Sequence, residues 1–191
     1  MILCVDCDNV LNNLTEKTLE LYNSQSGKNI QMSDIISYNF SECLPQEDAD
    51  GIVSLFKEKE LWDSLEPIKD SRWGIETLMN LGHRVIFATA THECNFEWKC
   101  QWLKKYFPII NTDDIVRIID KSLIRADVII DDCLEQLVGS CCERICFNMP
   151  WNQNKEKDFI YDIYRMYSWT DIINIINDIE RKNEEWMMGN I

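Results

Sequence analysis

Short apolar runs alternate with segments of helical periodicity along most of the chain. The runs that predict buried strands cover residues 2–5, 85–90, 115–119, 127–130 and 144–147. An apolar run without a polar break is typical of a parallel strand covered on both faces, although a run this short does not exclude a helix. Strands that alternate with helices in this way predict an α/β fold with a three-layer, doubly wound parallel sheet.

The segments between these runs carry apolar residues at helical spacing. We expect helices within residues 15–23, 33–36, 46–60, 73–81, 96–107, 158–165 and 168–179. Gly82 is an expected left-handed stop, and Pro108 ends the helix that precedes it. Ser168 and Asp171 form the pattern of a capped N-terminus for the last helix.

Residues 14–65 stand apart from this alternation. They contain helical patches and irregular segments, and no stretch that looks able to join a central sheet. Glu66 and Pro67 mark the return to the alternating pattern. We therefore expect a core made of residues 1–13 and 66–191, with residues 14–65 forming a small helical cap inserted after the first strand.

Polar residues follow the predicted strands where those strands end. They are Asp6 and Asp8 after the first strand, Thr89 to Thr91 after the second, and Asp131 and Asp132 after the fourth, with Lys121 between the last two groups. Because the carboxyl ends of parallel strands open on the same edge of a sheet, we expect these side chains to converge on one cleft. Each has an ordinary explanation by itself, such as a turn cap, a strand hydroxyl or a solvated lysine. The ordered set carries the prediction.

Asp6 and Asp8 lie two positions apart, so on an extended backbone both carboxylates leave the same side of the chain. Two carboxylates held this close repel each other unless a cation or a shared proton offsets the repulsion. Mg²⁺ is the economical cation, because it prefers oxygen ligands and is usually held by one or two carboxylates together with a substrate phosphate. Carboxylates, a threonine hydroxyl and a lysine together suit phosphoryl transfer.

The composition narrows the class of partner. The chain has 191 residues, enough for one sizeable core, and a net charge of −14. Such a surface repels polyphosphates, so a polynucleotide or an anionic membrane is a poor partner, whereas a small phosphate ester can bind where a cation reverses the local field. No secretory signal precedes the first strand, and no apolar stretch has the roughly 20 residues of a spanning helix, so we expect a soluble, cytoplasmic protein.

Nine cysteines are spread through apolar segments. Their odd number and the adjacent pair Cys141 and Cys142 do not fit a secreted disulfide framework, and we expect reduced, mostly buried thiols. Cys4 and Cys7 have the spacing of a zinc or redox pair. They lie in a predicted strand, however, where positions three apart face opposite sides, so we do not expect zinc or dithiol chemistry there.

The order of the strand-end motifs resembles the haloacid-dehalogenase superfamily of aspartate-nucleophile phosphotransferases, and within it the 5'(3')-deoxyribonucleotidase family. The resemblance covers nearly the whole chain. Its motifs are DCDNVL at 6–11, LEPI at 65–68, VIFATA at 85–90, DKSLIRADVIIDD at 120–132 and YSW at 167–169. The resemblance implies a Rossmann-like core with a helical cap. It also implies a Mg²⁺-dependent phosphomonoesterase acting on nucleoside monophosphates, with pyrimidine deoxyribonucleotides favoured.

The resemblance further implies a role for each acidic residue. Asp6 would be the nucleophile, forming an aspartyl-phosphate, and also a metal ligand. Asp8 would bind the metal through its backbone carbonyl and act as acid and base through its side chain. Asp131 would ligate Mg²⁺, and Asp132 would do so directly or through water.

The same resemblance implies a phosphate site made by Thr89, the backbone N–H of Ala90, and Lys121. Two positions depart from the family pattern. Asn9 stands where glycine is usual, and because asparagine tolerates the left-handed conformation we expect the turn to be kept. Ala90 stands where a second hydroxyl is common, which removes one phosphate contact or moves it to Thr91.

The helical cap is expected to supply the surface that distinguishes one base from another. The apolar candidates for this role are Leu14, Tyr38, Phe40, Leu61 and Trp62, and the alternative for each is the cap's own small core. His92 is expected to be a partly exposed residue at a helix entry. Two other functions stay open, namely the same chemistry on another small phosphate ester, and a catalytically silent binding or regulatory protein. A homodimer is also compatible with the sequence.

Overall fold

The computed structural model of the chain describes residues 1–153 and 155–189. Within these residues, six parallel strands form one sheet in the order β3-β2-β1-β4-β5-β6. The strands are β1 (Ile2–Val5), β2 (Arg84–Thr89), β3 (Ile115–Arg117), β4 (Val128–Asp131), β5 (Glu143–Phe147) and β6 (Ile163–Met166). The predicted doubly wound α/β fold is confirmed.

The order of the strands reverses beside β1. The chain runs outward from β1 through β2 to β3 on one side, and from β4 through β5 to β6 on the other. In the register, Val5 of β1 lies opposite Phe87 of β2 and Ile130 of β4. In open α/β sheets, ligands bind outside the carboxyl ends of the strands at such a reversal. The residues that follow β1, β2 and β4 are therefore placed around one point.

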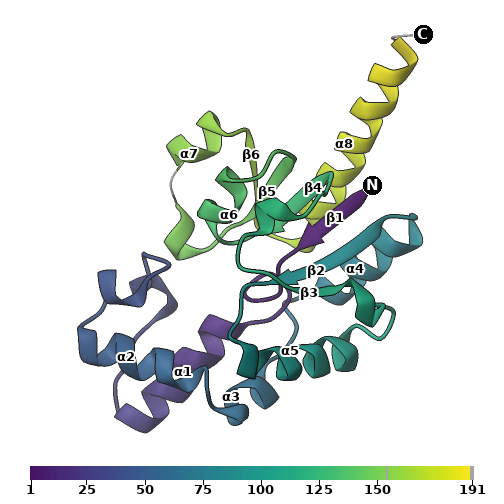
Figure 1. Cartoon of the computed structure of the whole chain (residues 1–191). Helices are drawn as coiled ribbons and strands as arrows, with labels where there is room; N and C mark the ends of the chain where they lie inside the picture. The colour runs from purple at the N-terminus through teal and green to yellow at the C-terminus, as the bar shows by residue number, and fades with distance from the viewer. Residues whose placement is uncertain (154, 190–191) are drawn as a thin grey trace.

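Helices pack on both sides of this sheet (Figure 1). They are α4 (Ser71–Asn80), α5 (Glu93–Tyr106), α6 (Leu134–Val138), α7 (Lys155–Ile160) and α8 (Trp169–Gly189). α8 packs against α4 and β6, and its C-terminal end extends away from the body (Figure 1). In α4, Ile75 and Leu78 are buried as predicted. Trp73 and Leu81, which the helical spacing put on the same face, are about half exposed.

Trp169, in the YSW motif, holds the turn after β1 in place. Its indole Nε1 donates a hydrogen bond to the backbone oxygen of Val10 at 3.0 Å. The same ring lies against Gly74 of α4, where a Cβ atom would be 2.4 Å from the ring carbon Cε3. Glycine is required at this position because the backbone of α4 and the indole ring approach too closely for any side chain.

We call residues 14–65 the helical insertion. The structure describes all of these residues, and none of them belongs to a strand of the sheet. Its helices α1 (Leu14–Ser26), α2 (Gln46–Leu55) and α3 (Lys59–Ser64) lie together beside the carboxyl ends of the strands (Figure 1). Short 3₁₀ turns span Met32–Asp34 and Phe40–Glu42. α1 ends at Gly27, whose φ of 71° is left-handed.

Two sequence-based expectations about these elements were wrong. The single helix expected over residues 46–60 is two helices, α2 and α3. The indole Nε1 of Trp62 donates a hydrogen bond to the backbone oxygen of Phe56 at 2.9 Å. This oxygen is therefore bonded to a side chain, and the chain turns before α3 begins. The helix expected over residues 158–165 ends early, and β6 follows it at the edge of the sheet. Asp162, at a left-handed φ of 49°, separates the two elements.

One continuous apolar core runs from the sheet into the helical insertion. Leu3 and Val5 of β1 belong to the same cluster of buried side chains as Leu19, Ile52 and Leu61 of the insertion. The insertion therefore shares the core of the sheet. The nine cysteines are free thiols. Among the described residues, no helix is long and apolar enough to cross a membrane.

Candidate active site

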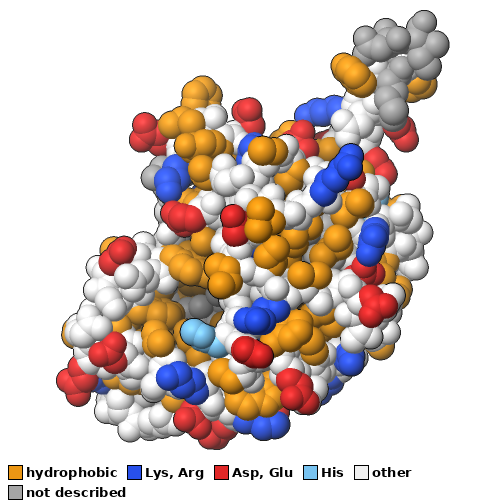
Figure 2. Space-filling model, in the orientation of Figure 1, with side chains coloured by type: hydrophobic (Ala, Val, Ile, Leu, Met, Phe, Trp, Pro, Cys, Tyr) orange, Lys and Arg blue, Asp and Glu red, His pale blue; other side chains and the backbone are white. Residues whose placement is uncertain are grey.

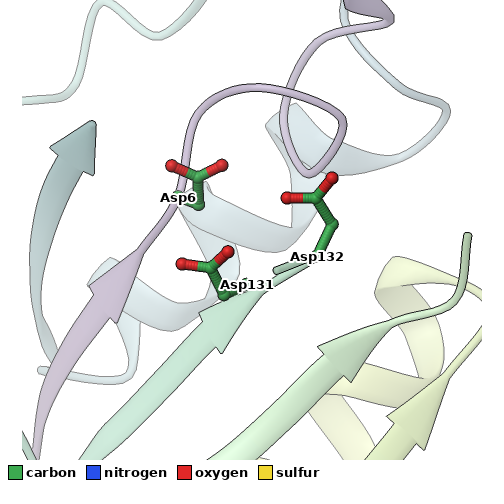
Figure 3. A group of neighbouring side chains, drawn as sticks. All are labelled: Asp6, Asp131 and Asp132. Atoms are coloured by element: carbon green, nitrogen blue, oxygen red, sulfur yellow. The ribbon is translucent and has the colours of Figure 1, made fainter. Parts of the chain in front are cut away.

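Three carboxylates meet where the strand order reverses. Asp6 follows β1, Asp131 is the last residue of β4, and Asp132 comes directly after it. Their side chains point toward one another (Figure 3), and one carboxylate oxygen of each lies within 4.8 Å of the others. All three residues are buried. The structure thus brings together the acidic residues that the sequence placed at the ends of different strands.

Lys121 reaches into this acidic cluster from the connection between β3 and β4. Its Nζ donates to Asp6 Oδ1 at 2.5 Å and to Asp131 Oδ2 at 2.6 Å, and the residue is only 3% exposed. The lysine sits at the start of a 3₁₀ turn, Lys121–Leu123, where its backbone N–H donates to Gln136 Oε1 at 2.9 Å. The turn and the ion pairs together hold the ammonium group beside Asp6.

The electrostatics of the cluster leave room for a further cation. Burial raises the pKa of Asp6 to about 7, and the attraction of Lys121 opposes this rise. Burial also raises the pKa of Asp132 well above its usual range. Because three buried acids face one buried lysine, a bound cation would stabilise their charged forms. The donor set is made of oxygen atoms, as hard cations such as Mg²⁺ require.

Asp132 is oriented by hydrogen bonds from two sides. Its Oδ2 accepts from Asn9 Nδ2 at 3.3 Å and from Trp151 Nε1 at 3.2 Å. Its backbone oxygen accepts from Asn152 Nδ2 at 2.8 Å. Trp151 and Asn152 were not singled out in the sequence, because they lie in a short 3₁₀ turn, Pro150–Asn152, that no motif marks.

Asn9 shapes the turn after β1. Its φ is 58°, which confirms that asparagine keeps the left-handed turn expected at this position. Its Oδ1 accepts a hydrogen bond from the backbone N–H of Thr15 at 2.9 Å, in the first turn of α1. A single side chain therefore connects the turn after β1, the insertion and, through its Nδ2, Asp132.

Asp8 faces a second lysine, Lys99 of α5. Lys99 Nζ donates to Asp8 Oδ2 and, at 2.6 Å, to Thr89 Oγ1, and the residue is 2% exposed. The other carboxylate oxygen of Asp8 accepts from Asn12 Nδ2 at 3.1 Å. Sequence reasoning missed Lys99. The signal that could have identified Lys99 is its position on the same helix face as Asn95 and Leu103, which are both buried.

A cavity of about 440 Å³ opens between the helical insertion and the strand ends. From the core it is lined by Asp8, Ala90, Thr91, His92, Asn95, Lys99 and Trp151, among others. In Figure 2, hydrophobic side chains border the hollow between the insertion and the rest of the molecule. His92 is exposed and directly precedes α5, which matches the expected helix-entry position.

Four of the five residues predicted to contact a base line this cavity. They are Leu14, Tyr38, Phe40 and Trp62. Leu61 does not line it, because its side chain is 0% exposed and lies in the apolar core. Trp62 is 4% exposed, and Lys99 Nζ lies over its ring, 5.3 Å from the centroid. Tyr38 also lines the cavity, although it is 58% exposed.

Comparison with known proteins places this site in a family. The family model described as "5' nucleotidase, deoxy (Pyrimidine), cytosolic type C protein" matches residues 1–183. The chain is 26% identical to a 5'(3')-deoxyribonucleotidase of Bacillus subtilis (strain 168) over 172 residues, 90% of this chain and 95% of the relative. It is 25% identical to a putative 5'(3')-deoxyribonucleotidase of Staphylococcus epidermidis over 181 residues, 94% of this chain and 97% of the relative.

Solved structures agree on the fold. A haloacid dehalogenase-like hydrolase from Streptococcus pneumoniae matches with a TM-score of 0.62 and 10% identity, covering 92% of this chain and 97% of that one. At this identity the likeness shows the fold alone. The family match extends over almost the whole chain and includes every residue of the acidic cluster and both buried lysines. The fold of the chain is that of a haloacid dehalogenase-like hydrolase, and the chain belongs to the 5'(3')-deoxyribonucleotidase family.

Proposed function

We propose that this protein is a Mg²⁺-dependent phosphomonoesterase that dephosphorylates deoxyribonucleoside monophosphates through an intermediate on Asp6. One observation carries the proposal. Lys121 bridges Asp6 and Asp131 at the adjacent carboxyl ends of β1 and β4, so a buried cation lies beside the candidate nucleophile. A lysine in that position can neutralise the negative charge of a phosphate that approaches a carboxylate.

In the first step, a carboxylate oxygen of Asp6 attacks phosphorus. The new bond joins this oxygen to phosphorus, and the bond between phosphorus and the sugar oxygen breaks. Asp8, in its protonated form, gives its proton to the departing sugar oxygen. The products of this step are the free nucleoside and a phosphorylated Asp6.

In the second step, a water molecule attacks the phosphorylated residue. Asp8, now a carboxylate, takes a proton from the water while the water oxygen bonds to phosphorus. The bond between phosphorus and the Asp6 oxygen breaks, which releases inorganic phosphate and regenerates the Asp6 carboxylate. Asp8 lies two residues from Asp6 and lines the cavity, which supports its use in both steps.

The side chains of Asp6, Asp131 and Asp132 would hold Mg²⁺. The family resemblance implies the backbone carbonyl of Asp8 as a further ligand. When bound, Mg²⁺ offsets the repulsion between the Asp6 carboxylate and the anionic phosphate. The fit rests on the chemistry of the donor set, which is three buried carboxylates with one lysine.

The phosphate would be bound by Thr89, the backbone N–H of Ala90, and Lys121. Lys99 adds a second positive charge on this side, because its ammonium group already contacts Thr89 Oγ1 and Asp8. The two buried lysines are paired with Asp8, Asp6 and Asp131, so a bound Mg²⁺ would be needed to bring the site close to neutrality. A site neutralised in this way supports a small phosphate ester as the substrate, in a protein whose net charge is −14.

The size and lining of the cavity support a nucleotide. A volume of about 440 Å³ lies within the roughly 300–1,000 Å³ that is typical of small-molecule sites. Tyr38, Phe40 and Trp62 supply aromatic rings to the lining of the cavity. Aromatic faces stack on bases. The preference for deoxyribonucleotides and pyrimidines follows from the family to which the chain belongs.

A screen of phosphate release tests the proposal. Purified protein is assayed with 5' and 3' deoxyribonucleotides, ribonucleotides and sugar phosphates, each with MgCl₂ and with EDTA. We expect release from deoxyribonucleoside monophosphates that requires Mg²⁺. Mg²⁺-dependent release from sugar phosphates alone would keep the chemistry and refute the nucleotide assignment. Release from none of these substrates would refute the proposed activity and favour a silent binding protein.

A further inference from the structure

The phosphate side of the site lacks one side-chain donor. Thr89 is followed by Ala90, which has no polar side chain to bind phosphate. Ala90 lines the cavity and is exposed, so its position faces the space that a substrate would enter. Another group on this side of the cavity would have to supply the missing hydrogen bond.

Asn95 lies on the correct face of α5 to do so. It lines the same cavity and is only 3% exposed. Lys99 is four residues further along the helix, and residues four apart share a helix face. Because Lys99 contacts Asp8 and Thr89, this face of α5 is turned toward the candidate phosphate site. Asn95 is one turn closer to the loop that carries Ala90.

The amide of Asn95 has an unused donor. Its Oδ1 is contacted by the thiol of Cys94 at 3.2 Å, but its Nδ2 has no hydrogen-bond partner among the described residues. Asn95 lines the cavity and Nδ2 is not enclosed by the protein, so this donor is open to a group bound in the cavity. The backbone N–H of Asn95 bonds to His92, so the helix start does not depend on the side chain.

The N-terminus of α5 adds a favourable field at the same place. α5 has 14 residues and begins at Glu93, directly after the loop of Ala90 to His92. The N–H groups and dipole of a helix N-terminus favour an anion. The unpartnered amide of Asn95 and this helix end therefore point to the same anionic ligand.

We infer that Asn95 is a phosphate-binding residue of this enzyme, whose Nδ2 donates a hydrogen bond to a phosphoryl oxygen in place of the hydroxyl that Ala90 lacks. The inference rests on the proposed function for the identity of the anion as the phosphate of the substrate. It explains how the site keeps a full set of donors although the residue after Thr89 has no polar side chain.

The test is a two-position cycle made of Asn95→Ala, Ala90→Ser and the double variant in the full chain. Affinity for inorganic phosphate is measured by calorimetry with MgCl₂, and KM and kcat are measured with the preferred nucleotide. We expect Asn95→Ala to raise both the phosphate Kd and KM about tenfold, as the loss of a hydrogen bond to a charged group would. Ala90→Ser in the double variant should recover most of this loss. The single variant Ala90→Ser should change the phosphate Kd by less than about twofold.

The controls separate binding from folding. Gln101→Ala removes an exposed amide from the same helix and should leave phosphate affinity unchanged. Asn95→Asp keeps the shape of the side chain but adds a like charge, so it should weaken phosphate binding more than Asn95→Ala does. It also serves as the test if Asn95→Ala does not fold. A phosphate Kd within twofold of wild type for the Asn95 variants, or a loss that Ala90→Ser does not recover, overturns the inference.

The outcomes also distinguish this inference from the proposed function. If the wild-type protein hydrolyses nucleotides and the Asn95 variants are unchanged, only the inference fails. If no nucleotide is hydrolysed, the proposed function fails, and calorimetry with inorganic phosphate still decides whether Asn95 binds the anion.

Discussion

The strand ends and the helical insertion build the two halves of one cavity in different ways. At the strand ends the functional side chains are buried, and Lys121 and Lys99 hold their acidic partners through hydrogen-bonded ion pairs. On the side of the insertion, Tyr38 is 58% exposed and lies in an irregular segment between two 3₁₀ turns. The proposed chemistry thus lies beside the strand ends, and the proposed base recognition lies on a segment that can vary without disturbing it.

The insertion shows the same contrast on a smaller scale. Leu61 and Trp62 are neighbours in α3, but Leu61 is enclosed in the apolar core while Trp62 lines the cavity and stacks against Lys99. On a helix, adjacent residues point about 100° apart, so one can serve the core while the next serves the site. The following predictions distinguish the effect of variants at the strand ends from that of variants in the insertion. They also test whether Leu61 stabilises the core or contributes to the cavity.

The largest effect is expected for Asp6→Asn. The substitution keeps the shape of the side chain but removes the nucleophilic charge, so kcat should fall by about four orders of magnitude or more. Thermal unfolding should remain cooperative. The exposed residue Asp113 provides the matched control, because Asp113→Asn should leave kcat unchanged. Appreciable Mg²⁺-dependent turnover by pure Asp6→Asn protein would exclude the covalent mechanism.

Asp8→Asn should have the next largest effect. Loss of a positioned general acid slows turnover by about 10² to 10⁴. If Asp8 meets the metal through its backbone, Mg²⁺ affinity measured by calorimetry should stay near the wild-type value. Asp63→Asn, at an exposed ion pair with Lys59, is the control and should change neither quantity. Loss of Mg²⁺ binding in Asp8→Asn would show that its side chain is a ligand.

Leu61→Ala tests whether the insertion depends on the shared core. Removing a fully buried leucine should lower the free energy of unfolding by about 2–5 kcal/mol, measured with urea. Leu81→Ala, on a residue that is 54% exposed, should cost much less. The ratio of kcat/KM for a nucleotide to that for p-nitrophenyl phosphate should not change in either variant. A loss of kcat/KM for the nucleotide alone in Leu61→Ala would show that Leu61 contributes to the binding surface.

Tyr38→Ala should give the smallest effect and the most selective one. A base stacked on an aromatic ring gains about 1–3 kcal/mol, so KM for nucleotides should rise while hydrolysis of p-nitrophenyl phosphate stays near wild type. Trp62→Ala, in contrast, should impair both substrates, because Trp62 also packs against Lys99. Tyr167→Ala, at an exposed tyrosine near α8, is the control. A parallel loss for both substrates in Tyr38→Ala would mean that Tyr38 supports the fold of the insertion.

Much of the strand-end site followed from local patterns. Apolar runs followed by Asp6, Thr89 and Asp131 identified three strands and the edge at which they open, and the structure has each at that edge. The left-handed turn at Asn9 also followed from residue type alone. The short edge strand β6 was missed because four residues with two buried side chains fit a helix as well as a strand.

The sequence by itself determined the first five strands and the acids and lysine at the strand ends, because hydrophobic period and turn chemistry act over a few residues. Tertiary structure alone decided that Lys99 reaches Asp8, that Trp151 bonds to Asp132, and that Trp62, rather than Leu61, lines the cavity. These contacts join segments far apart in the chain. They depend on how helices pack on the sheet, and no local pattern records which buried face meets which partner.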